Sequence, residues 1–188
     1  MLRTNQSFLS YTKELYAQQA RKEDIIVKKY SKGQRLFAQD EHATKLMVLA
    51  EGICKCYFTE SNDKAFILEF LGMGEIVGEV EYLRKINSLC NIEAITEVTV
   101  YAFSISYFQD LLKKDFYLNE LLLNVLAERI VNTSRRASYQ QLYTVQHSLN
   151  KLLDLQAQQE IAISKSDMAD YLGISLRSLN RELKNMER

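Results

Sequence analysis

Residues 164–184 read SKSDMADYLGISLRSLNRELK, and this stretch predicts two short helices joined by a tight turn. Ser164 is placed to cap the first helix, and the carboxylate of Asp167 suits the positive end of the helix dipole. Gly173 can adopt a positive φ and so make the turn, after which Ser175 can cap the second helix. The residues expected to face inward are Met168, Ala169, Leu172, Ile174, Leu179 and Leu183. Their order and spacing predict a helix-turn-helix.

The second helix of this motif has a polar and basic outer face. Arg177 and Arg181 are four residues apart, so they lie on the same side of a helix. Guanidinium groups in this position suit hydrogen bonding to guanine edges in the major groove of DNA. We therefore expect Arg177, Ser178 and Arg181 to face bases. The residues expected to contact phosphates are Lys165, Ser175 and Lys184. The alternative is a helical hairpin with a solvated basic face.

The first part of the chain has a different periodicity. Short runs rich in β-forming residues occur at 45–49, 53–58, 65–71 and 98–103, and glycines punctuate the segments between them. Several short strands with regular turn signals predict a compact antiparallel β-roll of jelly-roll type. A short helix is expected within residues 1–24, so the fold class is α+β.

A long helix is expected from about residue 116 to residue 139, after a shorter one at 106–114. Its apolar residues cover more than one stripe, so more than one face must be buried. One series has roughly heptad spacing, which is typical of a parallel helix pair between two subunits. This predicted dimer seam comprises Leu118, Leu122, Val125, Arg129, Asn132, Arg136 and Tyr139. The alternative is a single helix buried in its own domain.

Composition excludes several protein classes. The 188 residues carry 24 Lys and Arg against 24 Asp and Glu, with three Cys and no Pro. The first residues lack the pattern of a signal peptide, and no uninterrupted apolar stretch approaches the length of a membrane span. We expect a cytoplasmic protein without a membrane segment. His42 and His147 have no spaced ligand partner, so neither a metal site nor an enzyme is expected.

Taken together, these parts resemble the Crp/Fnr family of bacterial transcription regulators. In that family a cyclic-nucleotide-binding β-roll is joined by a long dimer helix to a winged helix-turn-helix. The likeness rests on YSKGQRLF at 30–37, LMVLAEG at 46–52, GEIVGE at 74–79 and the helix-turn-helix. Residues 77–81 and 171–177 look most like the YeiL-type subgroup.

The resemblance implies three parts: a sensor roll over residues 1–114, a dimerisation helix over 115–142 and a DNA-binding domain over 143–188. It implies a homodimer that binds double-stranded DNA sequence-specifically, with RNA polymerase as a further partner. The family's β-hairpin wing would follow the last helix, so we expect a domain whose wing is missing. Leu176-Arg177 replaces the family's Arg-Glu pair, so the operator of the best-known members is not expected. The alternative is a small-molecule sensor or protein-interaction module that does not bind DNA.

The resemblance also places an effector pocket. Gly78 and Glu79 match the cassette in which cAMP-binding relatives hold a ribose hydroxyl. The positions that grip the phosphate through Arg and Ser or Thr carry Ser88 and Leu89 here, so a buried phosphate would be poorly paired. We therefore expect an effector other than cAMP. Thr133 and Ser134 match positions that touch adenine, or are simply small residues at a crowded seam. The candidate pocket comprises Gly78, Glu79, Val80, Ser88, Leu89, Thr133 and Ser134.

The three cysteines are expected to be structural. Cys54 and Cys56 share one face of a predicted strand, and Cys90 comes later in the chain. Fnr-type relatives hold an iron–sulfur centre with an N-terminal cysteine cluster, and no Cys precedes residue 54 here. Free Cys packs as a small hydrophobe. We expect no cofactor, with redox or metal sensing by these cysteines as the alternative.

Overall fold

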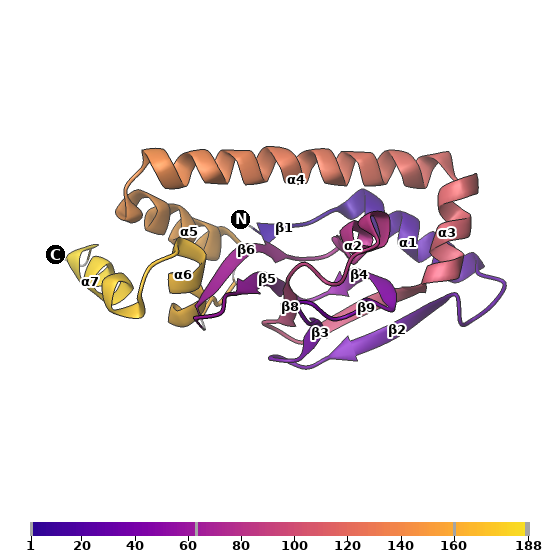
Figure 1. Ribbon diagram of the computed structural model, residues 1–188, viewed down its shortest axis with the longest axis horizontal. Helices are drawn as coiled ribbons and strands as arrows, with labels where there is room; N and C mark the ends of the chain where they lie inside the picture. The colour runs from indigo at the N-terminus through magenta and orange to yellow at the C-terminus, as the bar shows by residue number, and fades with distance from the viewer. Residues whose placement is uncertain (1, 63, 160, 187–188) are drawn as a thin grey trace.

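The computed structural model describes residues 2–62, 64–159 and 161–186. Its first part is a β-roll of two facing sheets (Figure 1). One sheet has the order β1 (Leu2–Arg3), β6 (Ala65–Leu71), β5 (Cys54–Thr59), β8 (Asn91–Ala94) and β3 (Arg35–Phe37). The other has the order β2 (Ile25–Tyr30), β9 (Val98–Ser104), β4 (Lys45–Glu51) and β7 (Ile76–Val77). The predicted roll is confirmed.

Strand pairing in the roll is antiparallel except at one edge, where β1 pairs with β6 in parallel. The core between the sheets holds Leu49 and Val100 of one sheet and Cys54 and Leu71 of the other, all nearly fully buried. These are the alternating inward positions of the runs that predicted strands. The two-residue strands β1 and β7 were not predicted, because a strand of two residues has no period to recognise.

The helices comprise those predicted within residues 1–24, at 106–114, from about 116 to 139 and in the helix-turn-helix, together with two at 79–84 and 145–159. They are α1 (Gln6–Gln18), α2 (Glu79–Arg84), α3 (Ile105–Lys114), α4 (Phe116–Leu142), α5 (Val145–Gln159), α6 (Lys165–Leu172) and α7 (Leu176–Met186). The long α4 runs over the length of the molecule, from α3 at one end to α5 at the other (Figure 1). Asp115 caps α4, because its Oδ1 accepts the N–H of Leu118 at 3.0 Å.

The first half of α4 packs on its own β-roll. Leu118, Leu122 and Val125 are at most 4% exposed and belong to one core cluster with Phe103 of β9 and Phe8 of α1. The assignment of Leu118, Leu122 and Val125 to a dimer seam is therefore wrong. The apolar residues that α4 leaves uncovered are on its other side, and they include Phe116, Leu123 and Ile130 at 90%, 68% and 67% exposure.

The C-terminal helices dock on the sheet that contains β6. Ile67 and Phe70 of β6 share a buried cluster with Met168 and Ala169 of α6 and Leu179 of α7. Ala169 is small where the sheet approaches α6 closely, and its side chain is 3% exposed. The position of the helix-turn-helix is therefore fixed against the roll as well as by the chain connection through α5.

Candidate functional site

The helix-turn-helix is built by local capping, as its sequence predicts. The Ser164 hydroxyl oxygen accepts the N–H of Asp167 at 3.0 Å, and the Ser175 hydroxyl oxygen accepts the N–H of Ser178 at 3.1 Å. Between the helices, Gly173 has a φ of +69°, a conformation that favours glycine. Leu179 is fully buried and anchors α7 to the rest of the motif.

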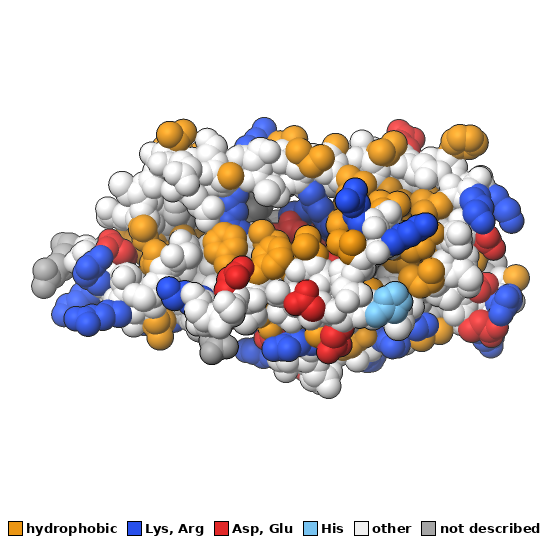
Figure 2. Space-filling view, viewed as in Figure 1, with side chains coloured by type: hydrophobic (Ala, Val, Ile, Leu, Met, Phe, Trp, Pro, Cys, Tyr) orange, Lys and Arg blue, Asp and Glu red, His pale blue; other side chains and the backbone are white. Residues whose placement is uncertain are grey.

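The outer face of α7 carries the predicted DNA-contacting residues. Arg177, Arg181 and Lys184 are exposed, and Figure 2 shows basic side chains gathered at the end of the molecule where α7 lies. Ser178 is half-buried, and its hydroxyl is 3.0 Å from that of Ser175, so both hydroxyls have an internal partner. Arg181 pairs with Glu182 at 3.5 Å, in an exposed contact that costs little to break.

The basic face extends to the first helix of the motif. Lys165 is exposed in the first turn of α6, and its Nζ lies 3.4 Å from the side-chain oxygen of Asn180. Of the six predicted DNA-contacting residues, all lie in α6, α7 or the turn between them. An exposed cationic face of this kind suits a polyanion, and the arginine pair suits planar, bidentate acceptors.

A second candidate site lies beneath α4. A cavity of about 650 Å³ opens between α4, the β-roll and the C-terminal helices, and Figure 2 shows the molecule hollowed there. Of the predicted pocket residues, Gly78, Glu79, Val80, Leu89 and Thr133 line it. Ser88 and Ser134 are not among its lining residues within the described chain. Ser88 is 2% exposed and packs with its backbone bonded to Asp40 and Glu41, whereas Ser134 is exposed.

Glu79 is held at the inner end of this cavity. Gly78, with a φ of +92°, turns the chain into α2 and leaves Glu79 as its first residue. The Glu79 side chain is buried, and Arg129 of α4 donates a hydrogen bond to its Oε1. Arg129 also donates to the carbonyl oxygen of Ile76 at 2.6 Å. Glu79 is therefore paired with α4 of its own subunit.

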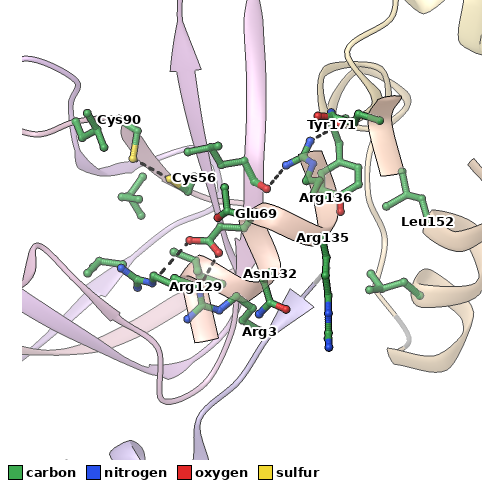
Figure 3. A pocket seen from close by; sticks show the side chains of 18 of the residues that line it. Arg3, Cys56, Glu69, Cys90, Arg129, Asn132, Arg135, Arg136, Leu152 and Tyr171 are labelled. Carbon is green, nitrogen blue, oxygen red and sulfur yellow. Dashed lines mark hydrogen bonds and ion pairs between the residues drawn. The ribbon is translucent and has the colours of Figure 1, made fainter. Parts of the chain in front are cut away.

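Further buried charges surround this pair (Figure 3). Arg3 of β1 is 4% exposed and pairs with Glu69 at 2.9 Å and with Glu75 at 2.8 Å. Arg129 lies 3.7 Å from Glu75 and 4.0 Å from Glu69. Burial raises the pKa of Glu75, which the charges of Arg3 and Arg129 offset only in part, and burial lowers the pKa of Arg129.

The second half of α4 also faces its own subunit. Arg136 donates hydrogen bonds to the carbonyl oxygens of Leu68 and Tyr171, the latter at 2.5 Å, and its guanidinium lies 4.1 Å from the centre of the Tyr171 ring. Asn132, one turn away, lines the cavity together with Arg129. The guanidiniums of Arg129 and Arg136 find partners on the roll and on α6, so placing these two residues in the dimer seam was wrong. Asn132 has no such partner, because its buried Nδ2 makes no hydrogen bond among the described residues.

Sequence reasoning missed Arg3, Arg129 and Arg136 as pocket residues. For Arg129 and Arg136 the available signal was their charge. Both stand in a heptad series that begins with apolar residues, and an arginine that is buried there requires a polar partner. Arg3 carried no signal, because its partners Glu69 and Glu75 are more than sixty positions away in the chain.

The cysteines are buried and free, and two of them border the cavity. The sulfur atoms of Cys56 and Cys90 are 2.7 Å apart. Burial raises the pKa of Cys54 to about 12, and the contact with Cys90, together with burial, raises the pKa of Cys56. Both effects disfavour the thiolate that binds metals. The described residues contain no group of three or more His, Cys, Asp or Glu side chains placed to hold a metal ion.

None of the described helices is both long and apolar enough to cross a membrane.

Comparison with known proteins identifies what this chain resembles. Residues 27–115 match the cyclic nucleotide-binding domain family. A probable transcriptional regulator, flp, of Lacticaseibacillus casei is 31% identical over 161 residues, covering 82% of this chain and 73% of that protein.

Among solved structures, the c-di-GMP-responsive global regulator CLP of Xanthomonas campestris superposes with a TM-score of 0.79 at 20% identity, covering 95% of this chain and 91% of that one. A regulator of the Crp/Fnr family from Eubacterium rectale superposes with a TM-score of 0.76 at 15% identity, covering 95% and 83%. These structural likenesses support the fold described above.

Proposed function

Because the chain belongs to the Crp/Fnr family of transcriptional regulators, we propose that it binds duplex DNA sequence-specifically as a homodimer. The observation that carries this proposal is the helix-turn-helix, whose apolar face is buried while Arg177 and Arg181 stand exposed on α7. Its relatives are regulators, which supports a role other than catalysis. The likeness to the YeiL-type subgroup stays a prediction.

In this proposal α7 enters the major groove. Arg177 and Arg181 hydrogen-bond to base edges, with Ser178 beside them, and so determine sequence preference. The residues that hold phosphates and so position the motif are Lys165, Ser175 and Lys184. The contacts of Ser175 and Ser178 with each other, and of Arg181 with Glu182, are replaced by contacts with DNA.

The dimer forms through the uncovered side of α4. Phe116, Leu123 and Ile130 follow one another at seven-residue intervals and are among the exposed apolar residues of α4. A strict seven-residue repeat on a long helix is typical of a helix pair with a shared seam. A two-fold axis along this seam gives two α7 helices, which favours a near-palindromic DNA site with half-sites about one helical turn apart.

The cavity beneath α4 is the proposed effector site. It has the volume of a small-molecule site, and its walls come from the roll, α4, α5 and α6. A ligand there contacts both the sensor part and the DNA-binding part of the chain, which is the requirement for coupling the two. The effector is not cAMP in this proposal, because Ser88 and Leu89 stand where the cAMP-binding relatives have the Arg and the Ser or Thr that hold the phosphate. The protein acts in the cytoplasm, with RNA polymerase as its further partner.

Selection of bound duplexes from a random pool tests this proposal. We expect enrichment of a two-fold symmetric motif, and an affinity that falls steeply as salt rises because phosphate contacts release counterions. The selection is carried out twice, once with the protein alone and once with a cell extract added as a source of the effector. If the protein binds no DNA at low salt, both with and without the extract, the result would instead favour a sensor or interaction module that does not bind DNA.

A further inference from the structure

The thiols of Cys56 and Cys90 meet in the wall of the cavity beneath α4. We propose that these two thiols form a disulfide bond when a peroxide enters the cavity, and that the bond weakens DNA binding. Formation of the bond is independent of the proposed function, whereas its effect on DNA binding rests on that function.

The fold brings the two sulfur atoms within reach of a bond. Cys56 lies on β5 opposite Ile92 of β8, and Cys90 is two residues before Ile92, so both side chains fall on the same face of the sheet. Both belong to the core cluster between the two sheets. Their sulfurs are 2.7 Å apart, across thirty-four positions of the chain (Figure 3). A disulfide bond is about 2.05 Å long, so closing it takes only a small movement of the two side chains.

Cys54, the remaining cysteine, is shielded from the cavity. It is fully buried on β5 opposite Ala94, and it is not among the cavity-lining residues of the described chain. Cys56 and Cys90 are 5% and 8% exposed, and both line the cavity. A small oxidant in the cavity therefore reaches Cys56 and Cys90 but not Cys54, which serves as an internal control.

Hydrogen peroxide supplies the oxidising equivalents for this bond. Cys90, the more exposed of the pair, loses its proton, and its sulfur attacks one oxygen of the peroxide. The O–O bond breaks, one oxygen stays on the sulfur as a sulfenic acid, and the other leaves as hydroxide, which takes up the released proton. The sulfur of Cys56 then attacks the sulfenic sulfur, and the hydroxyl group leaves with the proton of Cys56 as water. Two thiols are oxidised, and one peroxide is reduced to two molecules of water.

The surroundings of Cys56 slow the second step at neutral pH. The contact with Cys90 is the main cause that raises the pKa of Cys56, and burial is the next. The charge of Glu69 on β6 raises this pKa further, whereas the charge of Arg129 on α4 lowers it. Because the thiolate is the nucleophile, the bond should form faster at pH 9 than at pH 7.

The bond acts on the ion pairs that hold α4 over the roll. Cys56 lies opposite Glu69 of β6. The Glu69 carboxylate pairs with Arg3 at 2.9 Å and lies 4.0 Å from Nε of Arg129 on α4. Drawing Cys56 toward Cys90 displaces the strand position opposite Glu69 and so loosens these contacts. Because α4 leads through α5 to the helix-turn-helix, α7 is then held less firmly, and DNA affinity should fall at least about fivefold.

Peptide mapping tests the bond. Reduced protein is treated with hydrogen peroxide, denatured, alkylated and digested with trypsin. Lys55 separates Cys54 from Cys56, so cleavage after Lys55 puts these two cysteines in different peptides. We expect alkylated Cys54, and a peptide pair that joins Cys56 to Cys90 and lacks the two thiol hydrogens. Three alkylated cysteines, a link through Cys54, or oxygen added to a sulfur without a link would overturn the proposal.

DNA affinity is measured on the same samples with a duplex from the random pool. Peroxide should weaken binding by the wild type and by Cys54→Ala, and dithiothreitol should restore it. Cys90→Ser cannot form the bond, so its affinity should not change with peroxide. The recovery with dithiothreitol needs no variant, so it decides the question even where a substitution disturbs folding. A bond that forms without a change in DNA affinity would contradict its regulatory role.

Failure of this inference and failure of the proposed function give different results. Reduced protein that binds no DNA contradicts the proposed function, while the peptide map still decides whether the bond forms. Reduced protein that binds DNA and keeps three free thiols after peroxide contradicts only the bond.

Discussion

Lys55 on β5 and Asp167 in the first turn of α6 form an ion pair, with Nζ and Oδ1 2.7 Å apart, that joins the β-roll to the helix-turn-helix. The two side chains are 16% and 14% exposed, and Lys55 also pairs with Glu93 at 3.2 Å. Asp167 is at the same time the residue whose N–H is capped by Ser164. The start of α6 is therefore held by a local cap and by a contact from a strand more than one hundred residues earlier in the chain.

The Lys55–Asp167 pair should control how firmly α6 is docked. Lys55→Met removes the pair and should raise hydrogen exchange across residues 165–172, with a loss of about 1 kcal/mol in the free energy of docking. Strands β4 and β9 should keep their protection. Lys29→Met, an exposed substitution on β2, serves as the control and should leave exchange in α6 unchanged. Equal protection of α6 in both variants would show that the pair does not hold the docked position.

The buried carboxylate of Glu75 predicts a pH dependence of stability. Its pKa in the folded protein is raised by burial, so between that value and the unfolded value of about 4.3 the native state binds more protons than the unfolded state. The contribution of this protonation is fully present below the unfolded pKa and is lost as pH rises through the folded pKa.

The wild type should therefore gain stability relative to Glu75→Gln as pH falls from 7 toward 4. Urea denaturation of both proteins across this range measures the difference in their free energies of unfolding. A difference that stays constant with pH would mean that Glu75 does not titrate in this way.

If the dimer forms through the uncovered side of α4, a charged residue introduced there should weaken dimerisation. Leu123→Asp places a carboxylate in each half of the proposed dimer seam and should weaken dimerisation by about 3 kcal/mol, roughly a hundredfold. Asn124→Asp, at the neighbouring exposed position, is the matched control. Sedimentation velocity should show monomers for the first variant at concentrations where the second is dimeric. A dimeric Leu123→Asp protein would exclude this seam.

The helix-turn-helix and the roll were predictable because their signals are local. Ser164, Gly173 and Ser175 each act on residues within three or four positions, and strand runs such as 65–71 show their own periodicity. The orientation of α4 was not predictable in this way. Leu118 and Leu123 each belong to a series of apolar residues at heptad spacing, so the sequence does not distinguish them. Leu118 is buried because its side of α4 packs on the sheet that contains β9, whereas Leu123 lies on the uncovered side.

The polar contacts inside the cavity could not be predicted from the sequence either. Arg129 meets Glu79 across fifty positions, and Arg136 meets the carbonyl oxygen of Leu68 across sixty-eight. Such pairs depend on how α4 lies over the roll, for which a single sequence has no periodic signal. Of the residues that the resemblance assigned to an effector pocket, Gly78, Glu79 and Thr133 line the cavity, whereas Ser88 and Ser134 do not.

The most direct test of the account is a competition titration with a duplex selected from the random pool against a scrambled duplex. The wild type should prefer the selected duplex, and Arg181→Ala should lose about 1–3 kcal/mol of that preference while keeping its salt-dependent binding to both. Arg84→Ala, an exposed change on α2, should retain the full preference. Unchanged selectivity of the Arg181→Ala protein would contradict the assignment of α7 as the element that reads DNA.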